Sequence, residues 1–143
     1  MYLKSLDINT IFENSSYDKI STYANVKRAQ VTLLEKFREE FNEYDVFAMH
    51  PGWVDTPGVD EAIPNFAKKM QGRLRTALQG ADTILWLLST KSKIESGALY
   101  FDRKKVRKHF FFFTKKSNKL SNKLYQTLSE YRSKKQLLSL IHI

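Results

Sequence analysis

The sequence predicts an α/β fold with a parallel sheet. Two long stretches, residues 19–43 and 73–90, place apolar residues at steps of three and four, which is typical of helices that bury one face. Short apolar runs at residues 45–50 and 98–101 follow them and border turn-forming residues, which indicates buried strands. Strands that alternate with helices favour parallel pairing. Because a two-stranded sheet is not stable alone, we expect the chain to be part of a larger sheet.

The first elements follow from composition. Residues 1–18 are rich in Asn and Ser, which predicts a loop with a short extended piece at residues 1–6. N-cap candidates stand at residues 18–21, and no Gly or Pro interrupts residues 19–43. We therefore expect one long helix over residues 19–43, packed along most of its length.

The middle of the chain alternates loops and helices. The phrase PGWVDTPGVDE contains two prolines and two glycines and predicts a loop after the first strand. A short helix is expected within residues 60–69. The second long helix, which carries Trp86 as an expected core residue, ends where the apolar pattern fails at residues 91–93.

The C-terminal segment differs in charge from the rest of the chain. Residues 1–102 carry 12 Lys and Arg against 14 Asp and Glu, whereas residues 103–143 carry 12 Lys and Arg against one acid, Glu130. The formal charge of +9 therefore comes from the C-terminal segment. Four phenylalanines follow a basic run at residues 103–108, and residues 118–135 have the pattern of a basic amphipathic helix.

Several classes of site and location are disfavoured. The chain has no cysteine, so disulfides and thiolate metal sites are excluded, and a reducing compartment fits. The three histidines, His50, His109 and His142, have no metal-ligand spacing, so we expect no metal site. His50 is interpreted as a structural residue at a strand end. The N-terminus has no long apolar run, and we expect a cytoplasmic protein without signal peptide or transmembrane segment.

Tyr23 and Lys27 are the first candidate catalytic residues. They lie four residues apart within the expected helix, and therefore on the same face. A tyrosine can give a proton to a developing alkoxide, and a nearby ammonium favours the phenolate form that takes the proton back. On this pattern alone, the alternative of an amphipathic helix whose lysine stem lies along apolar surface is favoured.

A second motif, His50-Pro51-Gly52-Trp53-Val54-Asp55-Thr56-Pro57, stands at the end of the first strand. Ligands of open α/β sheets bind at the carboxyl ends of strands. Glycine allows a flat ring to approach the backbone, and the amides and hydroxyl that follow can hold a carboxamide. The alternative is an ordinary turn between a strand and a helix.

Taken together, Tyr-x-x-x-Lys on a long helix, a strand, and then Pro-Gly-x-Val-x-Thr resemble the short-chain dehydrogenase/reductase family. The phrases YANVKRAQVTL, MHPGWVDTPGV, QGADTILWL and YFDRK narrow the resemblance to one type within it. The resemblance implies the C-terminal portion of a Rossmann-like, doubly wound parallel sheet with a basic helical tail. It also implies NAD(P)-dependent oxidoreduction of a small-molecule carbonyl or alcohol. The roles implied are acid/base catalysis by Tyr23 with Lys27, and cofactor binding by Lys27, Pro51, Gly52, Val54 and Thr56.

Other family features are missing from the sequence. The five glycines form no Gly-rich phosphate loop, and no acidic residue is placed to bind a ribose 2′-OH, so the sequence does not distinguish NAD from NADP. The family's serine position falls near Thr10, and no serine nearby has the expected context. We therefore expect a partial, N-terminally truncated oxidoreductase that is inactive alone, with an incomplete Rossmann-type domain at residues 1–109 and a basic helical tail at residues 110–143.

The sequence allows two kinds of macromolecular partner. The helix at residues 19–43 presents a face that could pair in a homo-oligomer. The basic tail with its phenylalanines could instead make the chain a non-catalytic fragment that binds an anionic membrane surface or nucleic acid. A solvated extension, or one that packs on the rest of the protein, is the favoured interpretation of the tail.

Overall fold

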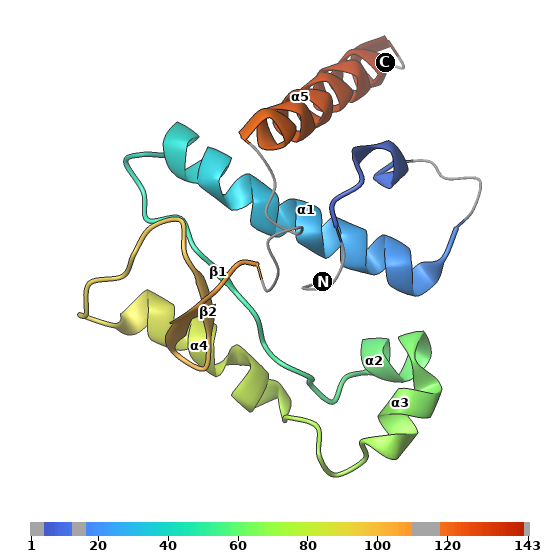
Figure 1. The fold of residues 1–143 in the computed structure, drawn as a ribbon, viewed down its shortest axis with the longest axis vertical. Helices are drawn as coiled ribbons and strands as arrows, with labels where there is room; N and C mark the ends of the chain where they lie inside the picture. Colours follow the sequence, from blue (N-terminus) through green and yellow to red (C-terminus); the bar gives the residue numbers. More distant parts are fainter. Residues whose placement is uncertain (1–4, 13–16, 110–117, 142–143) are drawn as a thin grey trace.

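The computed structural model describes residues 5–12, 17–109 and 118–141, which form a mixed α/β fold (Figure 1). In chain order the elements are η1 (Ile8–Thr10), α1 (Lys19–Glu40), β1 (Ala48–Met49), α2 (Pro57–Ala62), α3 (Pro64–Lys69), α4 (Ala77–Ser89), β2 (Leu99–Phe101), β3 (Lys104–Val106) and α5 (Asn118–Ile141).

The sheet has the order β1-β2-β3. β1 pairs in parallel with β2, with Ala48 opposite Leu99, which confirms the parallel pair expected from the sequence. β3 pairs antiparallel with β2, so the prediction of a wholly parallel sheet is wrong for this strand. The residues of β3 lie in the basic run at residues 103–108, for which no strand was predicted.

The hairpin between β2 and β3 explains that difference. Asp102 and Arg103 form a two-residue connection and have φ values of 49° and 60°. Positive φ at both central residues matches the twist of paired strands, but Asn-Gly is the usual signal for such a turn. Here side chains hold the turn instead, because Asp102 pairs with Arg75 and Arg103 pairs with Asp82.

Several predicted elements are shorter than expected, whereas α5 continues past residue 135 to Ile141 and two short helices, α2 and α3, replace the one expected within residues 60–69. α1 ends at Glu40, where the Phe41 amide still donates to the Phe37 carbonyl, instead of continuing to residue 43. α4 begins after Thr76, whose hydroxyl and the side chain of Gln79 form a capping box, so residues 73–75 are not helical. β1 keeps only two of the six residues predicted as strand.

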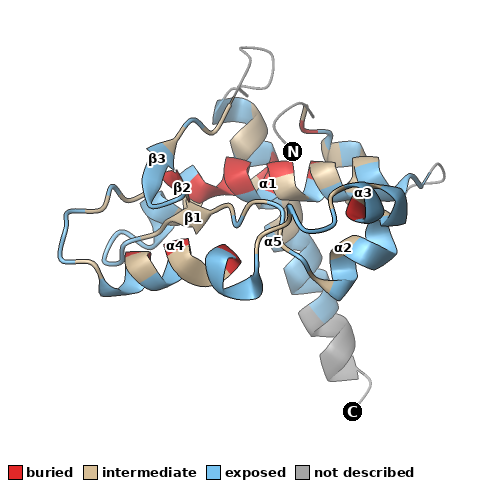
Figure 2. Cartoon of the chain, turned by 90° about the horizontal axis from the view of Figure 1, so that it is seen from below, coloured by how far each residue is buried: buried red, intermediate tan, exposed pale blue. Residues whose placement is uncertain are grey.

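One core cluster lies between α4 and the sheet. Its buried members are Leu87, Ala98 and Tyr100, and Trp86 packs against them half-buried, 6.0 Å from Tyr100 between ring centres. Leu99 is also buried, and since side chains alternate along a strand, it points to the face opposite to that of Ala98 and Tyr100. Figure 2 shows α1 on one side of the strands and α4 on the other. The sheet therefore lies between α4 and α1.

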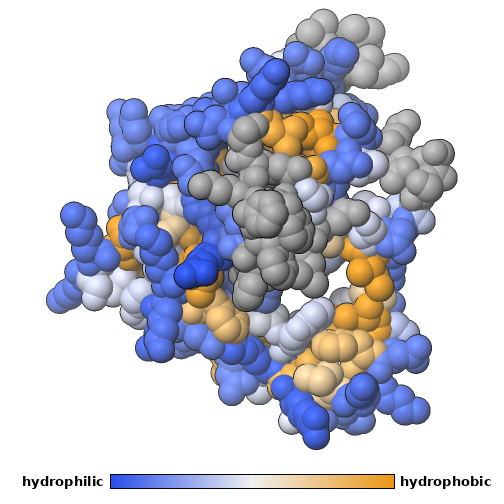
Figure 3. All heavy atoms as spheres, in the orientation of Figure 1, coloured by the Kyte–Doolittle hydropathy of each residue, from blue (hydrophilic) through white to orange (hydrophobic). Residues whose placement is uncertain are grey.

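A second cluster joins α5 to α1. Leu124 has an exposed fraction of 0% and packs with Leu6, Ala29 and Leu33. Figure 3 shows hydrophobic side chains gathered where α5 meets α1. The helix predicted in the basic tail thus buries its apolar side against the rest of the chain.

The basic run at residues 103–108 also contacts the body of the protein. Besides the Arg103–Asp82 pair, Lys105 pairs with Glu95, and Lys108 Nζ lies 2.5 Å from Glu35 Oε1. Such exposed pairs add little to stability, because water and salt screen their charges. Their arrangement nevertheless shows that part of the cationic excess is matched by acids of the first 102 residues.

Candidate functional site

The predicted catalytic pair lies on one face of α1. Asp18 caps the helix by accepting a hydrogen bond from the Ser21 amide at 2.6 Å. One turn later, the Nζ atom of Lys27 lies over the ring of Tyr23, 5.6 Å from its centre. Tyr23 is 64% exposed, so its phenol is open to an incoming molecule.

A buried amide fixes the N-terminal segment beside this pair. Asn25 is 1% exposed, and its side chain accepts from the Asp7 amide at 2.9 Å and donates to the Asp7 carbonyl at 2.7 Å. It also donates to Thr10 Oγ1 at 3.1 Å. The hydroxyl of Thr10, which stands where the resemblance would place a serine, is therefore a hydrogen-bond partner of α1. Sequence reasoning did not identify Asn25.

A buried cation anchors the next turn of the helix. Arg28 has an exposed fraction of 0%, and its Nη1 atom lies 2.8 Å from the Lys108 carbonyl and 3.2 Å from His109 Nδ1. A buried guanidinium needs such acceptors to compensate for lost hydration. Arg28 thus holds α1 against the chain that leaves β3, and it was also missed, because nothing in the local pattern marks its long-range partners.

The predicted bend follows β1 directly. The His50 amide donates to the Tyr100 carbonyl at 2.8 Å, and the Gly52 amide then donates to His50 Nδ1 at 2.8 Å. Gly52 has a φ of 78°, which only glycine adopts without strain. Pro51 and Gly52 therefore form the expected turn, and His50 is a strand-end residue that supports it.

After the bend, the backbone groups of Val54 and the hydroxyl of Thr56 are not used in the hydrogen bonds that hold this segment in place. Val54 forms an isolated parallel bridge with Arg75, in which Trp53 and Asp55 supply the hydrogen bonds at 2.8 Å each. The N–H and C=O of Val54 itself therefore lie on the other side of the segment. Thr56 is the N-cap residue of α2, but its side chain makes no capping hydrogen bond.

The predicted catalytic pair on α1 and the predicted cofactor-binding bend lie on elements that contact each other. In the described part of the chain, no hydrogen bond or ion pair joins Tyr23 or Lys27 to residues 51–56. Lys19, one turn before Tyr23 on the same face, donates to the Glu61 carbonyl at 3.2 Å. The start of α1 thus contacts the end of α2, the helix that directly follows the bend.

Three titratable side chains near the bend have shifted pKa values. Burial lowers the pKa of His50, and the positive charge of Arg75 acts in the same direction. The hydrogen bonds from Arg75 lower the pKa of Asp102, and the same contact raises the pKa of Arg75. His50 is therefore held neutral while the Arg75–Asp102 pair is held charged.

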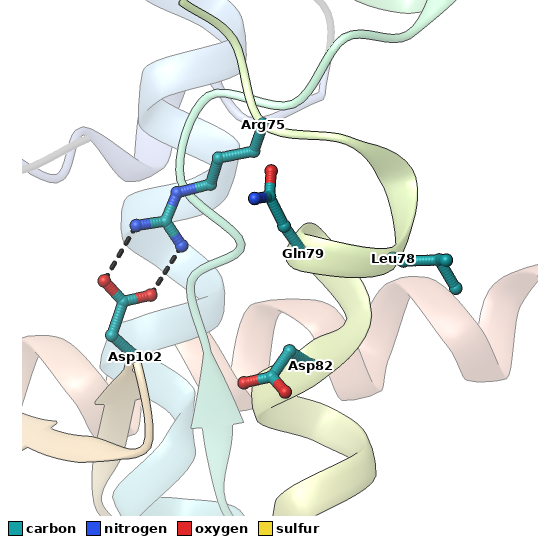
Figure 4. A pocket seen from close by; sticks show the side chains of 5 residues that line it. All are labelled: Arg75, Leu78, Gln79, Asp82 and Asp102. Atoms are coloured by element: carbon teal, nitrogen blue, oxygen red, sulfur yellow. Dashed lines mark hydrogen bonds and ion pairs between the residues drawn. The ribbon is translucent and has the colours of Figure 1, made fainter.

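The cavity beside this pair is shallow and charged. Arg75, Leu78, Gln79, Asp82 and Asp102 line an open depression of about 500 Å³ (Figure 4). Among the described residues, no group of three His, Asp or Glu side chains could hold a metal ion. A search of the same residues finds no helix with the length and apolar character needed to span a membrane.

Comparison with known proteins gives partial-length matches. The chain is 40% identical over 121 residues to the Homo sapiens protein named dehydrogenase/reductase SDR family member 12, which covers 82% of this chain and 38% of that protein. It is 40% identical over 99 residues to the Bos taurus protein of the same name, covering 68% of this chain and 31% of that protein. The chain therefore spans less than two fifths of the length of these curated relatives. No family model and no solved structure matches.

Proposed function

This chain belongs to the short-chain dehydrogenase/reductase family, and on that premise we propose that it carries the acid/base site of an NAD(P)-dependent oxidoreductase. The substrate class is a small-molecule carbonyl or alcohol. The observation that supports this most is the contact between Lys27 and an exposed Tyr23 on one helix face.

In carbonyl reduction, the Tyr23 hydroxyl would donate its proton to the carbonyl oxygen as hydride reaches the carbonyl carbon. The resulting phenolate would be stabilised by the Lys27 ammonium and would regain a proton from solvent. In alcohol oxidation, the same phenolate would take the hydroxyl proton. When bound, the reduced nicotinamide would supply the hydride for carbonyl reduction, and the oxidised nicotinamide would accept it in alcohol oxidation.

The bend provides the groups that would hold the nicotinamide. The Arg75 side chain fills the space where a side chain of residue 52 would stand, so a flat ring would lie against the opposite side of the Pro51–Gly52 backbone. The outward amide of Val54 and the hydroxyl of Thr56, which is not used for capping, can hold the carboxamide and a neighbouring phosphate. Lys27 would bind the adjacent ribose.

The sequence offers nothing comparable for the adenosine end of the cofactor. No Gly-rich phosphate loop is present among its five glycines. We therefore propose that residues 1–143 alone do not turn over substrate. The chain also lacks the residues that separate NAD from NADP, so the proposal covers both nucleotides.

The edge of the sheet fits a larger Rossmann-type architecture. The amides of Ala48 and His50 point to β2, so those of Phe47 and Met49 face the other side of β1. We propose that a further parallel strand pairs along this edge in the complete enzyme. In this view residues 1–109 carry the site, and residues 110–143 add the segment whose helix α5 covers α1.

The alternative function, binding of an anionic surface by the tail, is less well supported. Leu124, on the apolar side of α5, is buried against α1, so this side is not free to enter a membrane. The four phenylalanines at residues 110–113, on which the membrane alternative also rests, lie outside the described residues. Lys119 and Lys123 remain exposed and could contact phosphates. Retention of the chain on heparin at 0.15 M salt that is lost in a Lys119→Gln/Lys123→Gln variant would favour this alternative.

A homo-oligomer that forms through α1 would have to use the side of α1 that α5 does not cover. α5 covers the side of α1 that carries Ala29 and Leu33. Ile20, Tyr23 and Val26 are exposed on another side.

The proposed function is tested with a chimera in which this chain replaces the matched portion of the human relative. NADH and NADPH oxidation would be followed at 340 nm with a panel of aldehydes and ketones, beside the isolated chain. We expect turnover by the chimera with at least one nucleotide and none by the isolated chain. A chimera that is folded and binds nucleotide, but reduces no carbonyl and oxidises no alcohol, would overturn the proposal.

A further inference from the structure

Arg75 holds the segment after the bend through its main chain. Its amide donates to the Trp53 carbonyl at 2.8 Å, and its carbonyl accepts from the Asp55 amide at 2.8 Å. These two bonds form the isolated bridge with Val54. The segment that leaves the bend is therefore fixed to a residue from a different part of the chain, just before α4.

The side chain of Arg75 crosses the bend itself. A Cβ atom built on Gly52 would lie 2.7 Å from Arg75 Nε, so the guanidinium stem passes directly over this glycine. The guanidinium lies 4.7 Å from the centre of the Phe101 ring and pairs with both oxygens of Asp102, at 2.5 and 2.7 Å (Figure 4). A planar, two-point pair of this kind fixes direction as well as distance.

Phe101 connects this contact to the other side of the bend. The His50 ring meets Phe101 edge-on, with centres 5.7 Å apart, and His50 Nδ1 accepts the Gly52 amide. Arg75 and His50 therefore contact the same phenylalanine and the same glycine. The bend is held from both sides by groups anchored at the end of β2.

We propose that Arg75 is a positioning residue for the bend at residues 51–52, and that Asp102 is its anchor. The pair fixes the course of residues 52–55 and thereby the direction of the outward Val54 amide. The inference rests on the proposed function, which assigns this bend and this amide to the nicotinamide. Neither residue contacts Tyr23 or Lys27, so their role is exerted through the backbone alone.

The same hairpin provides a matched control. Arg103 and Asp82 form a second arginine–aspartate pair, with side chains 55% and 42% exposed, compared with 31% and 50% for Arg75 and Asp102. It joins the β2–β3 turn to α4 without contacting the bend. Asp102→Asn and Asp82→Asn each remove one carboxylate charge and nearly keep side-chain volume. Asn fits the positive φ of residue 102 at least as well as Asp, so a loss of protection in Asp102→Asn would come from the lost pair with Arg75 and not from the turn conformation.

The first measurement is amide hydrogen exchange in the isolated chain. We expect Asp102→Asn and Arg75→Lys to raise exchange at the Gly52 and Asp55 amides about two- to fivefold, the upper part of the range for one partly exposed pair. Asp82→Asn should leave these amides unchanged, and Asp102→Glu should restore most of the protection. Equal effects of Asp102→Asn and Asp82→Asn, or none of either, would overturn the proposal.

The second measurement uses the chimera and separates positioning from general stability. Asp102→Asn should raise the KM for the nicotinamide nucleotide several-fold with little change in the melting temperature, while Asp82→Asn should change neither. An unchanged KM in Asp102→Asn would overturn the positioning role. If the chimera itself is inactive, the proposed function fails, whereas the exchange result on the isolated chain still decides whether Arg75 and Asp102 hold the bend.

Discussion

Lys27 lies over the ring of Tyr23, with its Nζ atom 5.6 Å from the ring centre, one turn further along the same face of α1. A cation over an aromatic face is attracted by the ring's negative potential, and the contact keeps the two side chains together. Because Tyr23 is 64% exposed, its hydroxyl remains accessible. The helix thus presents a phenol and an ammonium group side by side on its surface.

Truncation of Leu124 should show that α5 belongs to the folded core. Leu124→Ala removes a side chain with no exposed surface, and we expect a loss of about 2–5 kcal/mol in unfolding free energy. Leu88→Ala is the matched control, because Leu88 is 73% exposed and its loss should cost no more than about 0.5 kcal/mol. Urea denaturation followed by circular dichroism measures both. Equal effects would mean that α5 does not pack on α1.

Gly80 should not tolerate a methyl group, although it lies inside a helix. A Cβ atom there would lie 2.6 Å from Val54 Cγ2, so Gly80→Ala forces α4 away from the segment that follows the bend. We expect a loss of about 1–3 kcal/mol despite the better helix propensity of alanine. Gly58→Ala has open space around it and should be neutral or stabilising by up to about 1 kcal/mol. A stabilising Gly80→Ala in the same denaturation assay would contradict this packing.

His50 should make stability depend on pH. Burial lowers its pKa in the folded chain from an ordinary value of 6.5, so the unfolded chain binds more protons between the two values. The stabilisation is therefore fully present above about pH 6.5 and is lost as the pH falls through the folded-state pKa. Thermal unfolding between pH 7.5 and 5 measures it, above the range in which Asp102 and Asp82 titrate.

A His50→Asn variant is the control for that measurement. The Asn side chain places an acceptor oxygen near the position of Nδ1 and does not titrate, so the Gly52 hydrogen bond can form at every pH. The variant should lose most of the change in melting temperature between pH 7.5 and 5. A wild-type melting temperature that is flat across this range, or a variant with the same slope as the wild type, would refute the role given to His50.

The parts of the fold that can be predicted from the sequence are those that depend on residues close to one another in the chain. The apolar spacing of α1 and α4 predicts helices, and Pro51-Gly52 predicts the turn that ends the first strand. β3 was missed because its turn, Asp102-Arg103, has no glycine and is held by ion pairs to distant residues. The amphipathic pattern of α5 likewise predicts an apolar face but does not say that α1 covers it.

The same limit applies to the site. The spacing of Tyr23 and Lys27 predicts that they share a face, as the structure shows. Arg75 has no such signal, since its partners lie 23 and 27 positions away on the sequence, at Gly52 and Asp102, and meet it only when the hairpin is formed. Two local features could have pointed to this pair: Arg75 directly precedes the N-cap residue of α4, and Asp102 directly follows β2.

The most direct test of the acid/base assignment compares two tyrosines in the chimera. Tyr23→Phe removes the proposed proton donor, and Tyr44→Phe removes a hydroxyl of similar exposure, 68% against 64%, beyond the end of α1. We predict that kcat for carbonyl reduction falls at least about 100-fold in Tyr23→Phe, the usual contribution of a positioned general acid, with nucleotide binding retained. Tyr44→Phe should keep wild-type kcat. Unchanged turnover in Tyr23→Phe, or equal losses in both variants, would contradict the assignment.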